Sequence, residues 1–350
     1  MKKTQMALAA AAMVASSIAL AEVKLSGVID IGVGSTSKNG NVGGMYMENG
    51  AYNDHSGLDF NISEDLGGGT KAYASLGMGF NPNGQSDNPG LAMANPTTNR
   101  FNGLFNRQSY VGLSSDFGSL QLGKQLSPYV LSNVFMMNYN GMFGVGRMTL
   151  VPGGTAGAFF VNDAIQYTTP SLGGFTATAM TTTKGSTQNN GFYDAGFAGS
   201  GQGYNAIHVY GAIGPFNATA AYHSVNRVVD GYNIGGTIDV VDGLTASIGY
   251  MSGKLEGKDR VGSWNIGAAY SLTPSLKLSA QYASSDATRD VKSRDLMNVM
   301  LAQSLSKRTT LYGTYGSGTG VGAAIGTLGG GIAQTDKSNS AFVIGVSHAF

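Results

Sequence analysis

Apolar and polar residues alternate along successive stretches of about ten residues, and this pattern constrains the fold more than any other feature. From Leu276 to Tyr282 every second residue is apolar, and Lys277, Ser279 and Gln281 stand between them. Successive side chains of a strand point to opposite faces, so each stretch predicts a strand with one apolar and one polar face. The same alternation recurs at 23–33, 58–62, 175–179, 216–223, 244–250 and 264–271.

Composition agrees with a strand-rich chain and excludes several other classes. There are 54 glycines in 350 residues, and a glycine inside a helix costs roughly 1 kcal/mol relative to alanine. The chain contains no cysteine, which excludes disulfides and thiolate metal sites. A net charge of +1 gives no basis for binding a polyanion, so no nucleic-acid partner is expected.

The first residues have the pattern of a secretory signal peptide. Lys2 and Lys3 precede an apolar run over 6–15, and the small-residue pattern of a cleavage site ends at Ala21. We therefore expect a leader at 1–21 and a single exported domain at 22–350; a buried N-terminal helix is the alternative. No second apolar run approaches 18 residues, which leaves a soluble secreted protein or a membrane β-barrel.

The alternating stretches and turn residues together predict sixteen strands. We place them at 23–34, 54–63, 70–80, 104–113, 118–125, 161–168, 174–183, 204–212, 216–225, 232–240, 244–252, 262–271, 276–283, 295–305, 309–317 and 339–350. Seven short connections alternate with eight longer ones, of which 126–160 is the longest. This asymmetry is typical of outer-membrane barrels, so we predict an all-β, 16-stranded antiparallel transmembrane β-barrel. A soluble β-sandwich or β-solenoid is the alternative.

Several segments resemble the Gram-negative general porins, most closely the proteobacterial trimeric porins of the neisserial and Comamonas type. The segments are VKLSGVID at 23–30, SEDLGGG at 63–69, NRQSYVGL at 106–113, DFGSLQLGKQ at 116–125, LSKRTTLY at 305–312 and the terminal HAF at 348–350. The resemblance covers the whole of 23–350. Each motif is short, but their order and spacing make the set specific.

This resemblance implies a homotrimer of barrels in the outer membrane, in contact with outer-membrane lipid and lipopolysaccharide. Each barrel would enclose a water-filled pore that is narrowed by the third long loop, 126–160, folded into the lumen. The terminal Phe350 resembles the signal that the barrel assembly machinery recognises. In the family, basic side chains on the barrel wall face acidic groups of the inward loop.

The predicted pore constriction contains Arg107, Lys71, Lys124, Arg147 and Asp163. Lys71 lies on the polar face of its strand by alternation, whereas Arg107 is assigned from the family match and Lys124 replaces a usual arginine. No Asp or Glu occurs between residues 116 and 163, so the inward loop has no acidic face. We therefore expect passive passage of small hydrophilic solutes and ions, with slight anion selectivity.

Other chemistry finds little support in the sequence. The four histidines, at 55, 208, 223 and 348, lack the spacing of a zinc site, and we expect His208 and His223 to face the lumen. We predict no cofactor, no metal and no catalytic residues, because no nucleophile–base pair or phosphate-binding loop can be assembled. A barrel enzyme and a surface adhesin on the same scaffold are the alternatives to a channel.

Overall fold

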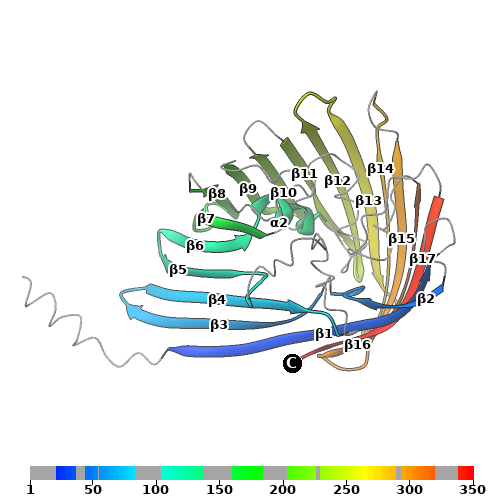
Figure 1. Ribbon diagram of the computed structural model, residues 1–350, viewed down its shortest axis with the longest axis horizontal. Helices are drawn as coiled ribbons and strands as arrows, with labels where there is room; N and C mark the ends of the chain where they lie inside the picture. Colours follow the sequence, from blue (N-terminus) through cyan, green and yellow to red (C-terminus); the bar gives the residue numbers. More distant parts are fainter. Residues whose placement is uncertain are drawn as a thin grey trace, which may run out of the picture.

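The computed structural model describes residues 21–36, 44–53, 55–82, 104–136, 160–183, 203–225, 229–288, 293–319 and 338–350. The strands follow one another as an antiparallel meander and form a continuous curved wall, with the helix α2 on its inner side (Figure 1). Their bounds are β1 (Glu22–Thr36), β2 (Gly44–Asn49), β3 (Ser56–Gly67), β4 (Thr70–Phe80), β5 (Ser109–Ser115), β6 (Gly118–Leu126), β7 (Phe160–Thr168), β8 (Phe175–Thr182), β9 (Tyr204–Ile213), β10 (Phe216–Val225), β11 (Val229–Val241), β12 (Leu244–Leu255), β13 (Val261–Ser271), β14 (Leu276–Ser285), β15 (Arg294–Ser304), β16 (Thr309–Thr319) and β17 (Ser338–Ala349). The helix α2 spans Pro128–Phe135.

The wall closes because the last strand pairs with the first. β17 runs antiparallel to β1 from Val28 opposite Ala349 to Thr36 opposite Ala341. At the end of this seam the backbone groups of Phe350 and Gly27 exchange two hydrogen bonds of 3.0 Å. Closure leaves no unpaired sheet edge, which is the condition for strands to cross a bilayer.

The closed barrel has sixteen wall strands, as predicted, although seventeen strand segments are present. β2 and β3 both run antiparallel to β1, β2 along Ile31–Thr36 and β3 along Glu22–Val28. They are therefore two parts of one wall strand, of which the first ends at Asn49 and the second begins at Ser56. The prediction of a loop over 35–53 was wrong at this point, since 44–49 continue the sheet.

The two faces of the wall differ in chemistry in the way the alternation predicts. Large apolar side chains such as Ile248 (66% exposed) cover the outer face, and polar ones such as Asn298 (2% exposed) point inward. This is the reverse of a soluble protein and matches a barrel in lipid. Among the described residues, no helix is long and apolar enough to cross a membrane.

Apart from β2, the predicted strand bounds agree with the structure to within about four residues, except at the start of the fourth predicted strand. We expected a strand over 104–113, but β5 begins at Ser109. Residues 107 and 108 still exchange backbone hydrogen bonds with Gly77, so the chain stays on the wall without forming a regular ladder. The seven short connections lie at 68–69, 116–117, 169–174, 214–215, 242–243, 272–275 and 305–308.

Candidate pore constriction

The first part of the third long connection is a helix on the inner wall. The Ser127 hydroxyl caps α2 by accepting the backbone N–H of Tyr129 and Val130, and Pro128 occupies the first turn. Proline suits this position because its missing N–H would have no partner there. The loop 126–160 thus enters the lumen through α2, as predicted; residues 137–159 lie outside the described part of the chain.

Buried polar groups attach α2 to the strands beneath it. The Ser132 hydroxyl lies 2.7 Å from the Thr219 hydroxyl and donates to the Asn233 side-chain oxygen at 2.6 Å. The Asn233 amide donates to the Tyr129 carbonyl at 3.2 Å. Burying a hydroxyl or amide is costly unless it is hydrogen-bonded, so these contacts specify one position of the helix on β10 and β11.

Aromatic contacts, two of them involving histidines, also hold α2 against β9 and β10. Tyr129 stacks on His223 with ring centroids 3.8 Å apart, and Phe135 stacks on Tyr210 at 4.9 Å. His208 donates to or accepts from Thr219 at 2.8 Å. Both histidines point inward, as expected, but both are buried beneath α2. His208 is opposite Ala221, so the two histidines are offset by two residues along neighbouring strands.

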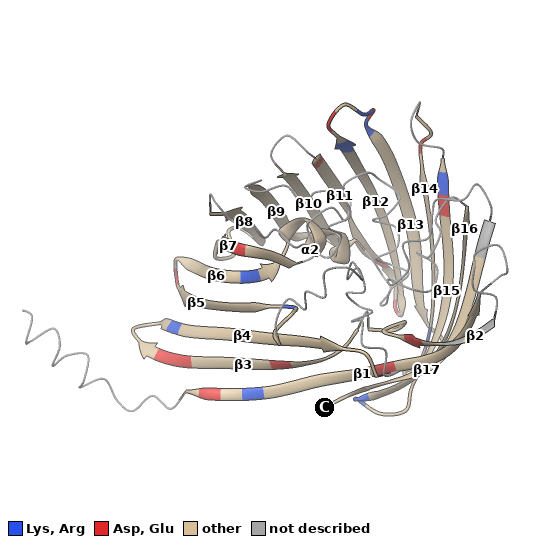
Figure 2. Ribbon diagram, viewed as in Figure 1, with Lys and Arg blue, Asp and Glu red and all other residues tan. Residues whose placement is uncertain are grey.

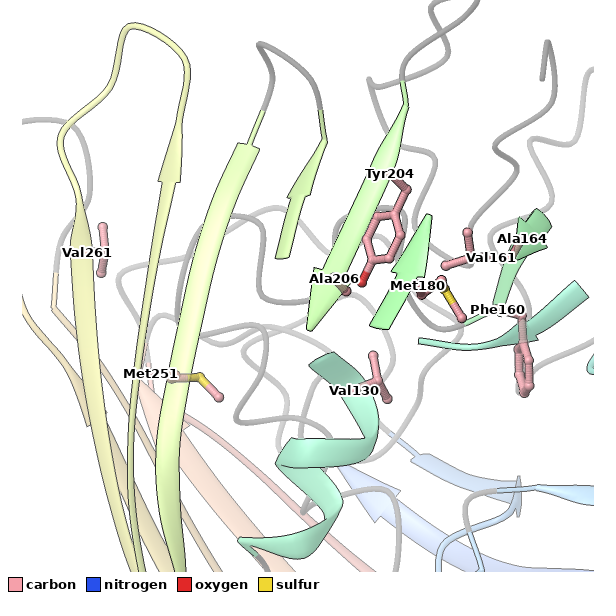
Figure 3. Packing of buried hydrophobic residues seen from close by; sticks show 9 residues of the cluster. All are labelled: Val130, Phe160, Val161, Ala164, Met180, Tyr204, Ala206, Met251 and Val261. Carbon is pink, nitrogen blue, oxygen red and sulfur yellow. The ribbon is translucent and has the colours of Figure 1, made fainter. Parts of the chain in front are cut away.

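A buried apolar cluster fills the space between α2 and the neighbouring wall. Figure 3 shows Val130 of α2 near Tyr204 and Ala206 of β9 and Met180 of β8. Phe160, at the start of β7, belongs to the same cluster. The cluster makes this side of the lumen solid, so α2 reduces the open cross-section of the barrel.

Arg107 lies on the inner wall next to this cluster. Its guanidinium carbon is 5.0 Å from the centroid of the buried Phe160 ring. The arginine stem also passes over Gly79 of β4, where an added Cβ would lie 3.3 Å from the Arg107 Cδ. The absence of a side chain at Gly79 therefore gives the arginine room to lie along the wall.

A row of polar side chains continues from Arg107 through Gln108, just before β5, to β4 and β3. The Gln108 amide donates to the Asp59 carboxylate at 3.3 Å and to the Ser75 hydroxyl at 2.9 Å. Ser75 in turn donates to the Asn61 side-chain oxygen at 3.1 Å. These groups give the inner wall a polar, hydrogen-bonding surface beside the arginine.

His55 stands near Arg107 at the beginning of β3. The pKa of His55 is lowered from 6.5 to about 3, first by burial and then by the positive charge of Arg107, while the hydrogen bond to the Asn53 carbonyl acts in the opposite direction. His55 is therefore neutral at physiological pH. It adds a polar ring to the wall without adding charge.

Lys71 and Asp163, two other predicted constriction residues, are exposed at separate places on the wall. Lys71 is exposed at the start of β4, six residues from Gly77, which accepts the Arg107 N–H. Six residues of strand span about 20 Å. Asp163 is exposed at an irregularity in β7 with φ of 53°. Figure 2 shows that charged residues are sparse along the strands.

Of the two remaining predicted constriction residues, Lys124 belongs to the described part of the chain. Lys124 is opposite Ser109 and has the parity of the exposed Leu120 and Leu122, next to the register shift between residues 123 and 125. That parity matches the outer face of β6. Arg147 lies outside the described residues.

Sequence reasoning missed a second inward feature, residues 50–53, which pack on Asp30 of β1. The Asp30 carboxylate accepts the backbone N–H groups of Tyr52 and Asn53. Alternation placed Asp30 on the inner face but gave no sign of this segment. The α2 start was readable, since serine followed by proline is a common helix beginning. Within the described ranges no three His, Asp or Glu side chains form a metal-type cluster.

Comparisons with known proteins agree with this architecture. A family model described as Gram-negative porin matches residues 7–348. Outer membrane porin protein 32 of Delftia acidovorans is 27% identical over 385 residues, covering 100% of both chains.

Solved structures share the fold. The anion-selective porin from Comamonas acidovorans superposes with a TM-score of 0.72 at 22% identity, covering 94% of this chain and 100% of that one. OmpT of Vibrio cholerae, folded in vitro, superposes with a TM-score of 0.65 at 13% identity, covering 95% and 100%. The closed sixteen-stranded wall, the inward third loop and the match along nearly the whole chain lead to one conclusion: the chain belongs to the Gram-negative porin family and forms a channel of the outer membrane.

Proposed function

We propose that this porin is a general diffusion pore for small hydrophilic solutes and ions with a weak preference for anions. Solutes move down their gradients, and the width and charge of the pore select among them. No cofactor and no energy source take part. The outer-membrane relatives, among them an anion-selective porin, support this choice.

The observation that carries the proposal is the exposure of Arg107 on the inner wall. Of the carboxylates there, Asp30 is fully covered, and Asp59 is partly exposed but accepts a hydrogen bond from Gln108. Arg107 is partly exposed above Phe160, whereas Asp30 has no exposed surface and its carboxylate accepts hydrogen bonds. The inward loop 126–160 contains Arg147 and no acidic residue. A permeating ion therefore meets Arg107 directly and meets the Asp30 charge only through the groups that cover it.

The test is the reversal potential of the purified channel in a planar bilayer across a salt gradient. We expect a slight anion preference at low salt that fades as salt rises, because the Debye length is about 10 Å at 0.1 M. Strong cation preference at low salt would contradict the proposal. It would then assign the dominant charge to Asp59, Asp163 or Asp30.

We also propose that the protein is a homotrimer inserted by the barrel assembly machinery through Phe350, with lipid and lipopolysaccharide around its outer face. A trimer form of OmpT of Vibrio cholerae, which shares the fold, supports the oligomeric state. The protein in mild detergent should migrate as an SDS-resistant trimer that dissociates on boiling. A single monomer band before heating, at several concentrations, would exclude the trimer.

A further inference from the structure

Residues 50–53 form a compact inward segment that interrupts the second wall strand. Between the paired positions Ile31–Asn49 and Val28–Gly57, β1 contributes two residues whereas the opposite chain contributes seven. Five extra residues therefore leave the ladder at this point. Residues 50–53 turn toward the lumen, against the inner faces of β1, β16 and β17.

Asp30 holds this segment in place. Its Oδ2 accepts the backbone N–H groups of Tyr52 at 2.8 Å and Asn53 at 2.5 Å, and its Oδ1 accepts the Tyr312 hydroxyl at 2.8 Å. Its backbone carbonyl accepts the Gly50 N–H at 3.0 Å. One buried carboxylate thus joins the segment to β1 and to β16, and hydrogen bonds to a charged acceptor are the strong ones.

The aromatic ring of Tyr52 extends this contact across the wall. It stacks on the Tyr312 ring with centroids 5.5 Å apart. The Tyr312 hydroxyl reaches Asp30 by passing over two glycines: an added Cβ would lie 2.3 Å from it at Gly345 and 3.1 Å from it at Gly32. The Asn53 amide also donates to the Ser347 hydroxyl. The contacting groups belong to the inner face, so the segment occupies lumen volume.

This segment lies opposite α2 around the barrel. Counting β2 and β3 as one wall strand, β1 and β17 are the first and sixteenth strands, and β9 and β10 are the eighth and ninth. α2 packs on β8 to β11. Thr219 under α2 and Tyr312 under Tyr52 are each the fourth residue of a strand that follows a short turn, so both contacts lie at similar depth along their strands.

We propose that residues 50–53 are a second constricting element of the pore, facing α2, and that Asp30 is the positioning residue that keeps them there. The proposal rests on the diffusion function and specifies what sets the width of the pore. Asp30 acts through the segment and has no exposed surface of its own. Its effect should therefore appear in the size of permeating solutes more than in their charge.

The decisive experiment compares Tyr52→Ala, Asp30→Ala and Asp30→Asn in planar bilayers and in liposome swelling with sugars of increasing size. Tyr52→Ala should raise single-channel conductance, on the order of 1.5-fold, because conductance follows the open cross-section. Asp30→Ala should raise both conductance and the largest sugar that enters. Asp30→Asn should stay near wild type, because the amide oxygen can accept the two N–H groups and the NH₂ can donate to Tyr312.

Asp59→Ala is the matched control, since it also removes an inner-wall carboxylate but touches Gln108 and not residues 50–53. It should move the reversal potential while leaving the sugar size limit unchanged. The double variant Asp30→Ala, Tyr52→Ala should increase conductance and the sugar size limit little more than either single variant, because both changes act on one segment.

The proposal is overturned if Tyr52→Ala leaves conductance and size limit at wild-type values, or if Asp30→Ala does so in assembled trimers. It is also overturned if Asp59→Ala widens the pore as much as Asp30→Ala. If Asp30→Ala does not assemble, the conductance and sugar size limit of Tyr52→Ala and Tyr312→Phe test the proposal instead, since both variants keep the carboxylate. Failure of the diffusion function would instead appear as absent conductance in the wild type.

Discussion

At the scale of single residues, the inner wall of this porin depends on where side chains are missing as much as on where they are present. Arg107 lies along the wall because Gly79 leaves it room, and Tyr312 crosses Gly32 and Gly345 to reach Asp30. Along the inner wall of a closed barrel, a long side chain can lie flat only where the residue beneath it leaves room. Glycine therefore decides which long side chains can lie flat and which must project into the pore.

Replacing Arg107 with alanine should move the reversal potential toward cations, because it removes a positive charge from the inner wall. Arg107→Lys is the control: it keeps the charge but loses the planar group that lies over Phe160, so its selectivity should stay close to wild type. Measurements at low salt maximise the difference. An unchanged reversal potential in Arg107→Ala would exclude this residue from the selectivity of the pore.

His55 should make the stability of the barrel fall as pH decreases. Its pKa is about 3 in the folded protein and 6.5 as an ordinary histidine, so between these values the unfolded chain binds a proton that the folded chain does not. Stability is therefore full above about pH 6.5 and decreases toward pH 3. In detergent, urea unfolding of His55→Gln should show a flatter pH dependence over this window.

The control for this experiment is His348→Gln, which removes an exposed histidine from β17. It controls for the loss of a histidine side chain as such. Identical slopes for wild type and His55→Gln would show that His55 contributes nothing to the pH dependence.

At the scale of elements, α2 is held by buried polar contacts in addition to apolar packing. Ser132 contacts Thr219 and Asn233, and Tyr129 stacks on His223. Polar contacts of this kind require one geometry, whereas an apolar surface tolerates sliding. These contacts therefore favour one position of the helix in the lumen.

Ser132→Ala should loosen α2 and increase open-channel current noise. The change leaves the Asn233 and Thr219 groups without the serine hydroxyl, at a cost of about 1–3 kcal/mol for a buried group left unsatisfied. Val134→Ala is the matched control, since Val134 is 45% exposed on the same helix. Equal noise in the two variants would mean that the serine contacts do not position the helix.

At the scale of the whole molecule, closure of the seam between β17 and β1 determines whether a barrel exists. The last backbone pair of this seam joins Phe350 to Gly27, and the Phe350 ring covers Gly27 so closely that an added Cβ would lie 2.6 Å from it. An open seam would expose unpaired backbone groups to lipid, each costing several kcal/mol. The terminal residue is thus part of the closure as well as the end of the chain.

Deleting Phe350 should reduce the amount of heat-modifiable, assembled protein in outer membranes. Deletion of Gly257, in the exposed connection between β12 and β13, is the comparison and should be tolerated, because a Cβ added there would meet no other atom within 4 Å. Phe350→Ala separates the two roles of the residue, since it keeps the backbone pair and removes the ring. Wild-type assembly after deletion of Phe350, at both low and high expression, would contradict this prediction.

Much of the architecture could be predicted from the sequence, for a physical reason. A strand between lipid and water must alternate, so its position and its lumen-facing residues are encoded locally, as at 276–285. Closure with sixteen strands followed from the count of alternating stretches and from the lengths of their connections. The predicted leader at 1–21 lies, except for Ala21, outside the described residues and stays a prediction, as does the role of the constriction residues.

The arrangement inside the pore was decided only by the tertiary structure. Alternation indicated that Asp30 and His223 point inward, but not that residues 50–53 cover the one and α2 covers the other. It also could not separate Lys71, near a short turn, from Arg107, about 20 Å farther along the wall. Strand pairing is dictated by a local period of two residues, whereas inward segments are held by contacts between residues far apart in the chain, such as Asp30 with Tyr312. Sequence alone therefore determined the wall, and folding determined what narrows the space within it.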